Sequence, residues 1–316
     1  MTNKELLPKM GKVLIPIEES VCSERALVFA GCLLARLSPE ITQEVWVVHV
    51  LSATYLQTMA QRLDFRVEVL KDTALFRSLR ENYLKEKVYP LLDKALEQLR
   101  ALGVKAELKK EVLHGDPAKE IINLAQEGGF QTVIMGRRGL SCLKEKFLGS
   151  CSLAVSHRSG SHTTYIVGQK IKDHTCPPLK IVVPVDGSKP SLGALKEASG
   201  LALALEDKVK AVSLLHVIDA AYELDHLPER IEEAKKLLEE FKNKALSYGV
   251  PEGMLRTDMR IGRPASEIIS YASEEGFNLI IMGRRGLTGL KEFILGSVSS
   301  KVLHKAEDFT VALVSE

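Results

Sequence analysis

Apolar residues along the second half of the chain recur at two alternating spacings. Short runs rich in β-branched and aliphatic residues predict buried strands at 180–185, 210–217, 256–261, 278–282 and 310–314. Between these runs, apolar residues lie three or four positions apart, which predicts helices at 188–205, 229–248, 265–275 and 297–304. Ser188 is the expected N-cap of the first of these helices. Strands and helices that alternate in this way predict a parallel sheet with helices on both faces.

The same order of patterns occurs twice because the chain contains an internal repeat. Residues 115–150 and 262–297 are identical at 23 of 36 aligned positions. The first strand and its turn also match, as KVLIPIEES at 12–20 and KIVVPVDGS at 180–188. We therefore expect an α/β fold of two repeated doubly wound domains, each a mostly parallel five-stranded sheet with helices on both faces. The expected domains are residues 1–170 and 177–316, joined by a polar, proline-ended segment at 169–178.

The first copy contains about 20 more residues than the second. This extra segment, about 51–88, belongs to a charged and largely helical stretch at 54–101 that includes Tyr55, Phe65, Phe76, Tyr83 and Tyr89. Two interpretations stay open. One is an extended second helix with a surface excursion, and the other is a lid or partner-binding arm.

The composition excludes several classes of protein. The chain is 45% hydrophobic and 27% charged, with a formal charge of only +2, so it offers no general electrostatic attraction for nucleic acid. Aromatic residues make up 5% and do not interleave with basic ones, which disfavours single-strand binding. No apolar run approaches the roughly 20 residues that span a bilayer, and the N-terminus has no signal-peptide core. We expect a cytoplasmic protein without a nucleic-acid or membrane partner.

Cysteine and histidine spacing predicts no metal site. The five cysteines form no CxxC pair, and no HExxH occurs. We expect Cys22 and Cys32 to be buried free thiols, and we expect no disulfide framework. His49 and His216 occupy equivalent places at the end of the second strand of each copy, and we expect them to be hydrogen-bonded structural histidines.

The motif most indicative of function is a loop that both copies share. It reads Gly283-Arg284-Arg285-Gly286, then Gly296-Ser297 after nine residues, and its counterparts are Gly136, Arg137, Arg138, Gly139, Gly149 and Ser150. Each loop starts at the carboxyl end of a strand, where open parallel sheets bind ligands. Glycine lets backbone amides approach phosphate and permits positive φ, and a helix start presents unpaired amides to an anion. The pattern predicts phosphate binding, although a single such loop also suits an ordinary tight turn.

This G-x2-G-x9-G-[ST] pattern resembles that of the universal stress protein family, in a tandem two-domain form. The first-strand turn at 184–188 (PVDGS) and the second-strand LLHV at 214–217 are also similar. The resemblance implies an adenine-nucleotide α-hydrolase-like fold and an ATP pocket, with or without Mg²⁺, in a regulatory or stress-response protein. It places Asp186 near the adenine edge or ribose and the backbone of Val212 against the adenine. The remaining residues expected to line the pocket are Pro184, Val185, Met282, Gly283, Arg285, Gly286, Gly296, Ser297, Val298 and Ser299. We expect one of Arg284 and Arg285 to face the ligand or both to be solvated.

The first copy departs from this pattern. Glu18-Glu19 replaces Asp-Gly, and Cys151 stands where the second copy has Val298. Two carboxylates beside a polyanionic ligand are unfavourable unless Mg²⁺ or arginine neutralises them. We therefore expect the competent site in the second copy. Binding by the first copy, through Gly136, Arg138, Gly139, Gly149 and Ser150, stays open.

No catalytic motif accompanies the loops. The chain contains no GxxxxGK[ST], GxGxxG, GxSxG or kinase signature, and no dedicated base for phosphoryl transfer is visible. We do not expect an enzyme, although slow ATP hydrolysis stays open. An enzyme of a related adenine-nucleotide fold is disfavoured because SGGxDS and HIGH are absent. A nucleotide-independent interaction scaffold is the other alternative.

The terminal strands of the copies, 164–167 and 310–314, are expected at sheet edges, which favour pairing. In the family that the chain resembles, these edges form a dimer contact. The resemblance therefore implies that the two domains pair within one chain, and a homodimer through the extra segment stays open.

Overall fold

The computed structural model describes residues 6–52, 74–139, 148–158, 160, 162–169, 176–221, 226–286 and 295–315. The first repeat contains β1 (Lys12–Pro16), α1 (Val21–Leu34), β2 (Glu44–Leu51), α3 (Ala74–Tyr83), a π-helical turn (Leu84–Val88), α4 (Tyr89–Ala101), β3 (Glu107–His114), α5 (Pro117–Glu127), β4 (Thr132–Gly136), α6 (Ser150–Arg158) and β5 (Thr163–Val167). The second contains β6 (Leu179–Pro184), α7 (Lys189–Leu205), β7 (Val209–Asp219), α8 (Leu227–Ser247), β8 (Leu255–Gly262), α9 (Pro264–Glu274), β9 (Leu279–Gly283), α10 (Ser297–Lys305) and β10 (Thr310–Val314), with short 3₁₀ turns at Glu206–Lys208 and Glu252–Met254.

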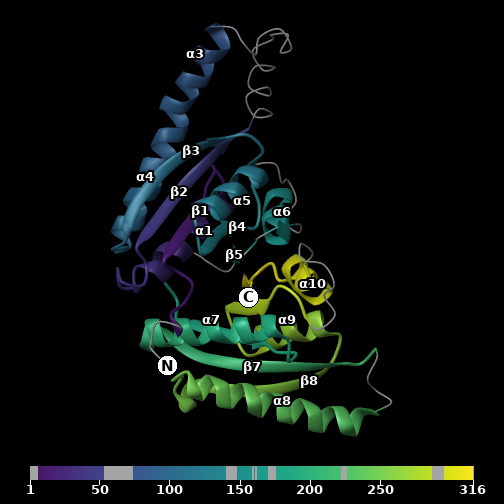
Figure 1. Ribbon diagram of the computed structural model, residues 1–316. Helices are drawn as coiled ribbons and strands as arrows, with labels where there is room; N and C mark the ends of the chain where they lie inside the picture. The colour runs from purple at the N-terminus through teal and green to yellow at the C-terminus, as the bar shows by residue number, and fades with distance from the viewer. Residues whose placement is uncertain are drawn as a thin grey trace.

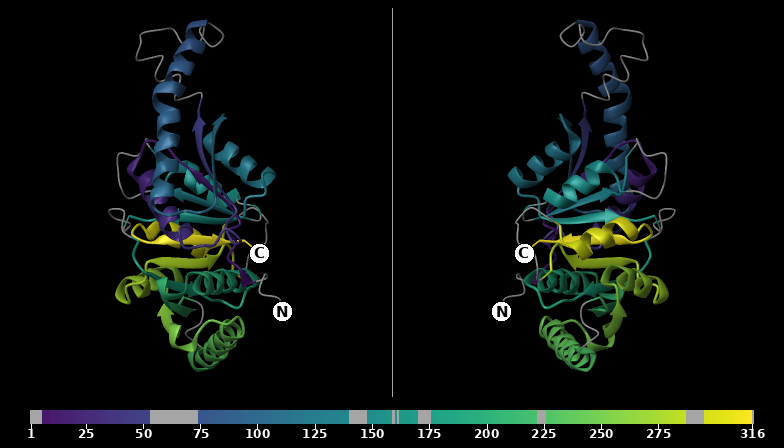
Figure 2. Two further views of the ribbon diagram at one scale, coloured as in Figure 1. Left: turned by 90° about the vertical axis from the view of Figure 1, so that its left-hand side faces the viewer. Right: turned by 90° about the vertical axis from the view of Figure 1, so that its right-hand side faces the viewer.

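The ten strands of the described residues form one continuous sheet. Their order is β3-β2-β1-β4-β5-β10-β9-β6-β7-β8. Strands within each repeat are parallel, whereas β5 and β10 pair antiparallel with Tyr165 opposite Ala312. Figure 2 shows these two strands side by side at the centre of the molecule, between the repeats. The predicted fold class, two doubly wound units with mostly parallel five-stranded sheets, is confirmed.

Helices cover both faces of the sheet (Figure 1). One face is packed by α1, α4, α7 and α8 through apolar residues that include Leu27, Leu92, Leu195 and Phe241. The other is packed by α5, α6, α9 and α10 through residues that include Ile121, Val155, Ile268 and Val302. Because both faces are buried, the strands have continuous apolar runs rather than alternation. None of the described helices is long and apolar enough to cross a membrane.

The extra segment is helical from Ala74 onward. α3 continues through the π-helical turn into α4, and α3 projects beyond the sheet (Figure 1). Val88 of the turn and the apolar side of α4 are buried in the core, and Tyr83 at the end of α3 packs partly against it. The largely helical prediction is therefore confirmed for residues 74–101. The remainder of the segment, 53–73 with Tyr55 and Phe65, lies outside the described residues, as does most of the joint at 170–175.

A buried polar contact joins the repeats beside the β5–β10 seam. The Tyr165 hydroxyl donates to Glu197 Oε1 at 2.8 Å, and the Lys9 amide donates to Glu197 Oε2 at 3.0 Å. Tyr165 is 0% exposed and Glu197 is 3% exposed. Burial raises the pKa of the Glu197 carboxyl, and the two donated hydrogen bonds oppose this shift. The seam therefore contains a specific hydrogen-bonded pair in addition to the backbone ladder.

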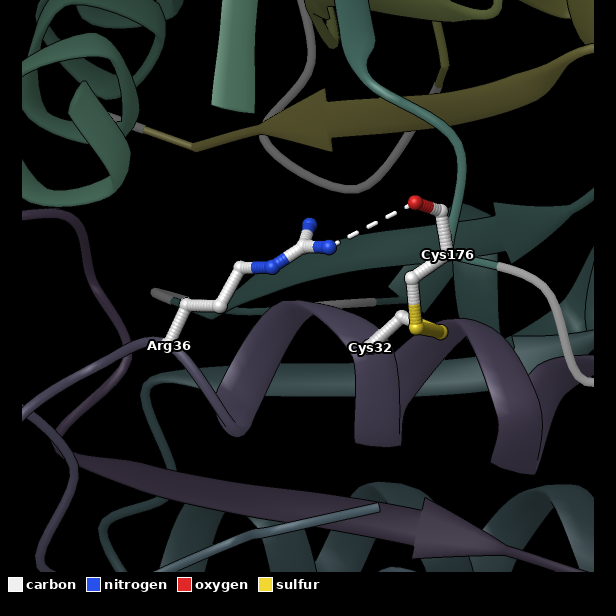
Figure 3. Close-up of a disulfide and its surroundings, with 3 residues drawn as sticks. All are labelled: Cys32, Arg36 and Cys176. Carbon is white, nitrogen blue, oxygen red and sulfur yellow. Dashed lines mark hydrogen bonds between the residues drawn. A yellow bond between two sulfur atoms is a disulfide. The ribbon is translucent and has the colours of Figure 1, made fainter. Parts of the chain in front are cut away.

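The cysteine prediction was wrong for Cys32. Cys32 on α1 and Cys176, just before β6, form a disulfide with a Cα–Cα distance of 5.3 Å (Figure 3). Arg36, one turn further along, donates to the Cys176 carbonyl at 3.4 Å. Cys22 and Cys151 are free thiols and half-buried. The pairing was missed because its partners are 144 residues apart and meet only when the second repeat docks against α1.

We expect Cys32→Ser to lower the free energy of unfolding by about 2–4 kcal/mol under oxidising conditions, because the disulfide closes a long loop in the unfolded chain. Chemical denaturation with and without reductant measures this effect. Cys22→Ser, a free thiol on the same helix, is the matched control and should have little effect. If reduction of the denatured wild type released no additional pair of thiols, the disulfide would be absent and the prediction would fail.

Candidate functional site

Each repeat has a switch point where the strand order reverses. In the second repeat this point lies between β6 and β9, which are adjacent strands of the sheet. The chain leaves β6 through Asp186 and leaves β9 through the glycine loop that begins at Gly283. A Cβ atom at Gly286 would lie 2.5 Å from Asp186 Oδ2, so the carboxylate rests directly against the loop. The fold thus places the two candidate elements together where ligands bind such sheets.

The turn after β6 holds Asp186 in place. Asp186 Oδ1 accepts hydrogen bonds from the Ser188 amide at 3.0 Å and the Ser188 hydroxyl at 2.6 Å. Ser188 Oγ in turn accepts from the Ser191 amide at 3.2 Å, which confirms the predicted N-cap. Gly187 has φ of +81°, a conformation that favours glycine. Asp186 therefore uses one oxygen to shape the turn and presents the other to the loop.

The glycine loop packs closely against its surroundings. A Cβ at Gly283 would lie 2.6 Å from the Pro190 backbone, and Ser299 Oγ donates to the Gly283 carbonyl at 2.9 Å. The Gly296 amide donates to the Arg284 carbonyl at 2.8 Å, which fixes the start of α10 beside the loop. The exposed Ser297 begins that helix, so the amides of its first turn lie near the same edge. Pro184 and Val298 are half-buried, whereas Val185 and Met282 are buried.

The sequence analysis expected glycine in these loops partly because glycine permits positive φ. The structure does not support that reason. The described glycines with positive φ do not include Gly136, Gly139, Gly149, Gly283, Gly286 or Gly296. Their common feature is a close neighbour where a side chain would stand. Close approach is therefore the property that requires glycine in both loops.

Of the two loop arginines, Arg284 does not face the crevice. Its side chain is 7% exposed and donates to the carbonyls of Ser156 and His157 in the first repeat at 2.8 and 2.7 Å. Burial, followed by the charge of Arg285, lowers its pKa to about 10, so it stays protonated near neutral pH. Arg285 is half-buried and is the remaining guanidinium of this loop.

Val212 lies away from this edge, and its expected contact with adenine is not supported. It is 0% exposed and pairs with Ile181 on one side and Leu255 on the other, near the start of β7. The end of β6, Pro184, lies opposite Leu215, so β7 reaches the crevice only from His216 onward. Val217 is half-buried and lies beyond that point, near the carboxyl end of β7.

The two equivalent histidines are structural. His216 Nδ1 lies 2.8 Å from the Val185 carbonyl, and His49 Nδ1 lies 2.9 Å from the Ile17 carbonyl. Each ring can donate to the chain that leaves the first strand of its repeat, which confirms the prediction. Burial lowers the pKa of His49, so its neutral form is favoured.

The first repeat builds the same frame with different charges. The Gly149 amide donates to the Arg137 carbonyl at 2.8 Å, and Ser152 Oγ donates to the Gly136 carbonyl at 2.8 Å. A Cβ at Gly139 would collide with the Glu18 carboxylate. Glu19 replaces Gly187 and does not adopt positive φ, so the two turns differ in backbone conformation.

A second charge difference, besides Glu19 in place of Gly187, was not anticipated. Asp116 caps α5 by accepting from the Lys119 amide at 2.9 Å, whereas Arg263 occupies the same position at α9 without a side-chain cap. Burial raises the pKa of the Cys151 thiol to about 12, with further contributions from the Glu18 and Asp116 carboxylates. The start of α6 therefore lies in a negative field. The sequence already contained this difference, because Gly-Asp-Pro at 115–117 aligns with Gly-Arg-Pro at 262–264.

A cavity of about 270 Å³ adjoins the acidic turn of the first repeat. It lies between α1 and α4, and its walls include Glu18, Glu19 and Glu24 together with Lys94. An anionic ligand entering here would face three carboxylates and one ammonium group. This net negative charge is a further difference between the first repeat and the second. The described residues contain no cluster of three or more side chains suited to hold a metal ion.

These features define an α/β protein duplicated within one chain, with a close-packed glycine loop at each switch point. The profile of the universal stress protein family matches residues 10–163 and 179–312. The chain therefore belongs to the universal stress protein family.

Known relatives agree with this assignment. Universal stress protein MJ0531 of Methanocaldococcus jannaschii is 36% identical over 135 residues, which is 40% of this chain and 76% of the relative. Universal stress protein YxiE of Bacillus subtilis is 37% identical over 139 residues, 39% of this chain and 90% of the relative. A universal stress protein structure from Archaeoglobus fulgidus covers 96% of this chain and 98% of its own, with a TM-score of 0.66 and 23% identity. The last comparison shows a shared fold across both repeats.

We expect Glu18→Gln to accelerate alkylation of Cys151 at pH 8, because it removes a carboxylate that opposes the thiolate. In the wild type, a pKa of about 12 keeps alkylation slow, and the rate should rise with pH until that value is approached. Iodoacetamide labelling followed by peptide mass spectrometry measures the rate. Glu24→Gln, on the neighbouring helix, should leave it unchanged. Equal rates in Glu18→Gln and wild type would contradict the proposed field.

Proposed function

We propose that the second repeat binds ATP as a regulatory ligand in a stress response. The observation that carries this proposal is the contact between Asp186 and Gly286 at the switch point, beside the start of α10. Family membership gives the stress-response setting. The first repeat has the same frame, and its additional carboxylates favour an asymmetric pair of sites.

Each part of the site suits one part of a nucleotide. The amides and dipole of the first turn of α10 attract phosphate, with the Ser297 hydroxyl as a further donor. Gly283 and Gly286 let the backbone approach the phosphate oxygens. Arg285, the second arginine of the loop, adds positive charge there. Asp186 Oδ2 is an acceptor for a ribose hydroxyl or an adenine amino group. The carboxyl end of β7, at Val217, is the expected wall for the base.

We propose that ATP is bound as a ligand and is not hydrolysed as a substrate. Asp186 Oδ1 is engaged by the turn and His216 Nδ1 by the Val185 carbonyl, so both groups have structural roles, and the sequence contains no dedicated base for phosphoryl transfer. Phosphoryl transfer needs a positioned nucleophile together with stabilisation of the developing charge. Phosphate release should therefore be slow relative to ATP dissociation, with or without Mg²⁺.

Gly286→Val should abolish ATP binding, because its side chain would displace Asp186 and close the loop. Isothermal titration calorimetry on ligand-stripped protein measures the binding constant and the number of sites. Gly139→Val, the equivalent change in the first repeat, is the matched control and should leave one site intact. ADP, AMP and cAMP distinguish the contribution of phosphate charge from that of the adenosine.

Absence of ATP binding by correctly folded wild type would refute the proposal. The nucleotide-independent scaffold would then become the leading function, with the projecting α3 as its candidate contact surface. Retained binding by Gly286→Val would instead show that the site lies elsewhere.

Converting the charges of the first repeat should create or strengthen a second ATP site. The triple variant Glu18→Asp, Glu19→Gly and Asp116→Arg gives that repeat the residues of the second at three positions. We expect calorimetric stoichiometry to rise toward two, because the frame is already present and the repulsion is reduced. The reverse variant, Asp186→Glu, Gly187→Glu and Arg263→Asp, should weaken the second site. No change in either variant would show that charge does not set the asymmetry.

A further inference from the structure

Arg137, in the glycine loop of the first repeat, reaches across the seam. Its side chain is 2% exposed. It donates to carbonyls at the end of α10 in the second repeat: Leu303 at 2.7 Å, His304 at 3.2 Å and Ala306 at 3.1 Å. These carbonyls belong to the last turn of a helix, where backbone acceptors lack intrahelical partners. The arginine thus caps a helix that belongs to the other repeat.

Arg284 makes the reciprocal contact. It caps the end of α6 in the first repeat through the Ser156 and His157 carbonyls. The Ser315 hydroxyl accepts a weaker bond from Arg284 Nη1 at 3.3 Å. A cation at a helix carboxyl end is stabilised by the helix dipole, and its bonds to carbonyls are charge-assisted. The two loops therefore exchange caps across the seam.

The same two arginines also hold the starts of the helices in their own repeats. The Arg137 carbonyl accepts from the Gly149 amide just before α6, and the Arg284 carbonyl accepts from the Gly296 amide just before α10, each at 2.8 Å. Both helices contain only nine residues, so a displacement at one end moves the other. The contacts form a closed ring in which each loop touches the start of one helix and the end of the other.

We propose that Arg137 and Arg284 are positioning residues that couple the two loops. Arg137 sets the position of α10, whose first turn borders the candidate ATP site of the second repeat. Through its contacts with the end of α6, Arg284 makes the position of α6, and thus of the first-repeat loop, depend on whether that site is occupied. This inference rests on the proposed function for its ligand, whereas the ring of contacts is independent of it.

The first test measures ATP binding to a variant altered outside the second repeat. Arg137→Met should raise the dissociation constant of the second-repeat site about tenfold, within the range typical of coupling between sites. Arg137→Lys retains the charge with fewer donors and should give a smaller increase. Arg100→Met, an exposed arginine of α4 in the same repeat, is the control and should bind as wild type. Wild-type affinity in Arg137→Met would overturn the proposal. If Arg137→Met does not fold, wild-type affinity in Arg137→Lys would overturn the proposal.

The second test uses hydrogen exchange to follow the signal in the opposite direction. ATP should increase protection of amides at 151–154, at the start of α6, in wild type. Arg284→Met should lose this remote protection at saturating ATP, and Arg284→Lys should partly restore it. Persistence of the remote protection in Arg284→Met would refute the coupling.

If wild type binds no ATP, the proposed function fails and the ring is tested alone. Arg137→Met should then accelerate exchange of amides at 298–301 in the ligand-free second repeat, and unchanged exchange there would refute the coupling.

Discussion

The antiparallel pairing of β5 with β10 is the constraint on which the rest of the structure depends. Each repeat ends in an apolar strand that would otherwise be an exposed sheet edge. Pairing removes both edges at once and continues the sheet through the whole molecule. It also brings Tyr165 to Glu197 and each loop arginine to the end of a helix in the other repeat. The polar contacts follow from this arrangement of the backbone.

Hydrophobic periodicity was sufficient to predict the fold because the same order of strand and helix patterns occurs in both copies. The last strand matches its expected bounds, Thr310–Val314, and the other predicted elements of the second repeat differ from the observed ones by at most a few residues. Apolar runs buried on both faces and a serine cap are local features, so the sequence contains them directly. The position of the glycine loop at the carboxyl end of a strand followed from the order of these elements.

Contacts between distant segments could not be predicted in the same way. Cys32 pairs with a residue of the joint, and Arg284 bonds to carbonyls 127 and 128 residues away. Neither spacing has a local signature. Val212 was misplaced for a different reason, since its role depends on where β7 passes the end of β6, and only the strand register determines that. Asp116 and Arg263 were visible when the two repeats were aligned, but the relevance of Asp116 required knowing that the head of α5 lies near Cys151.

The covalent joining of the repeats has an evolutionary consequence. In a dimer of identical chains, a substitution near one glycine loop necessarily appears at both. Here Glu18, Glu19 and Asp116 stand on one side, and Asp186, Gly187 and Arg263 stand on the other. Fusion into one polypeptide releases the two copies from obligatory identity. Each copy is then free to carry its own charges beside the loop, and the seam keeps both in one folded unit.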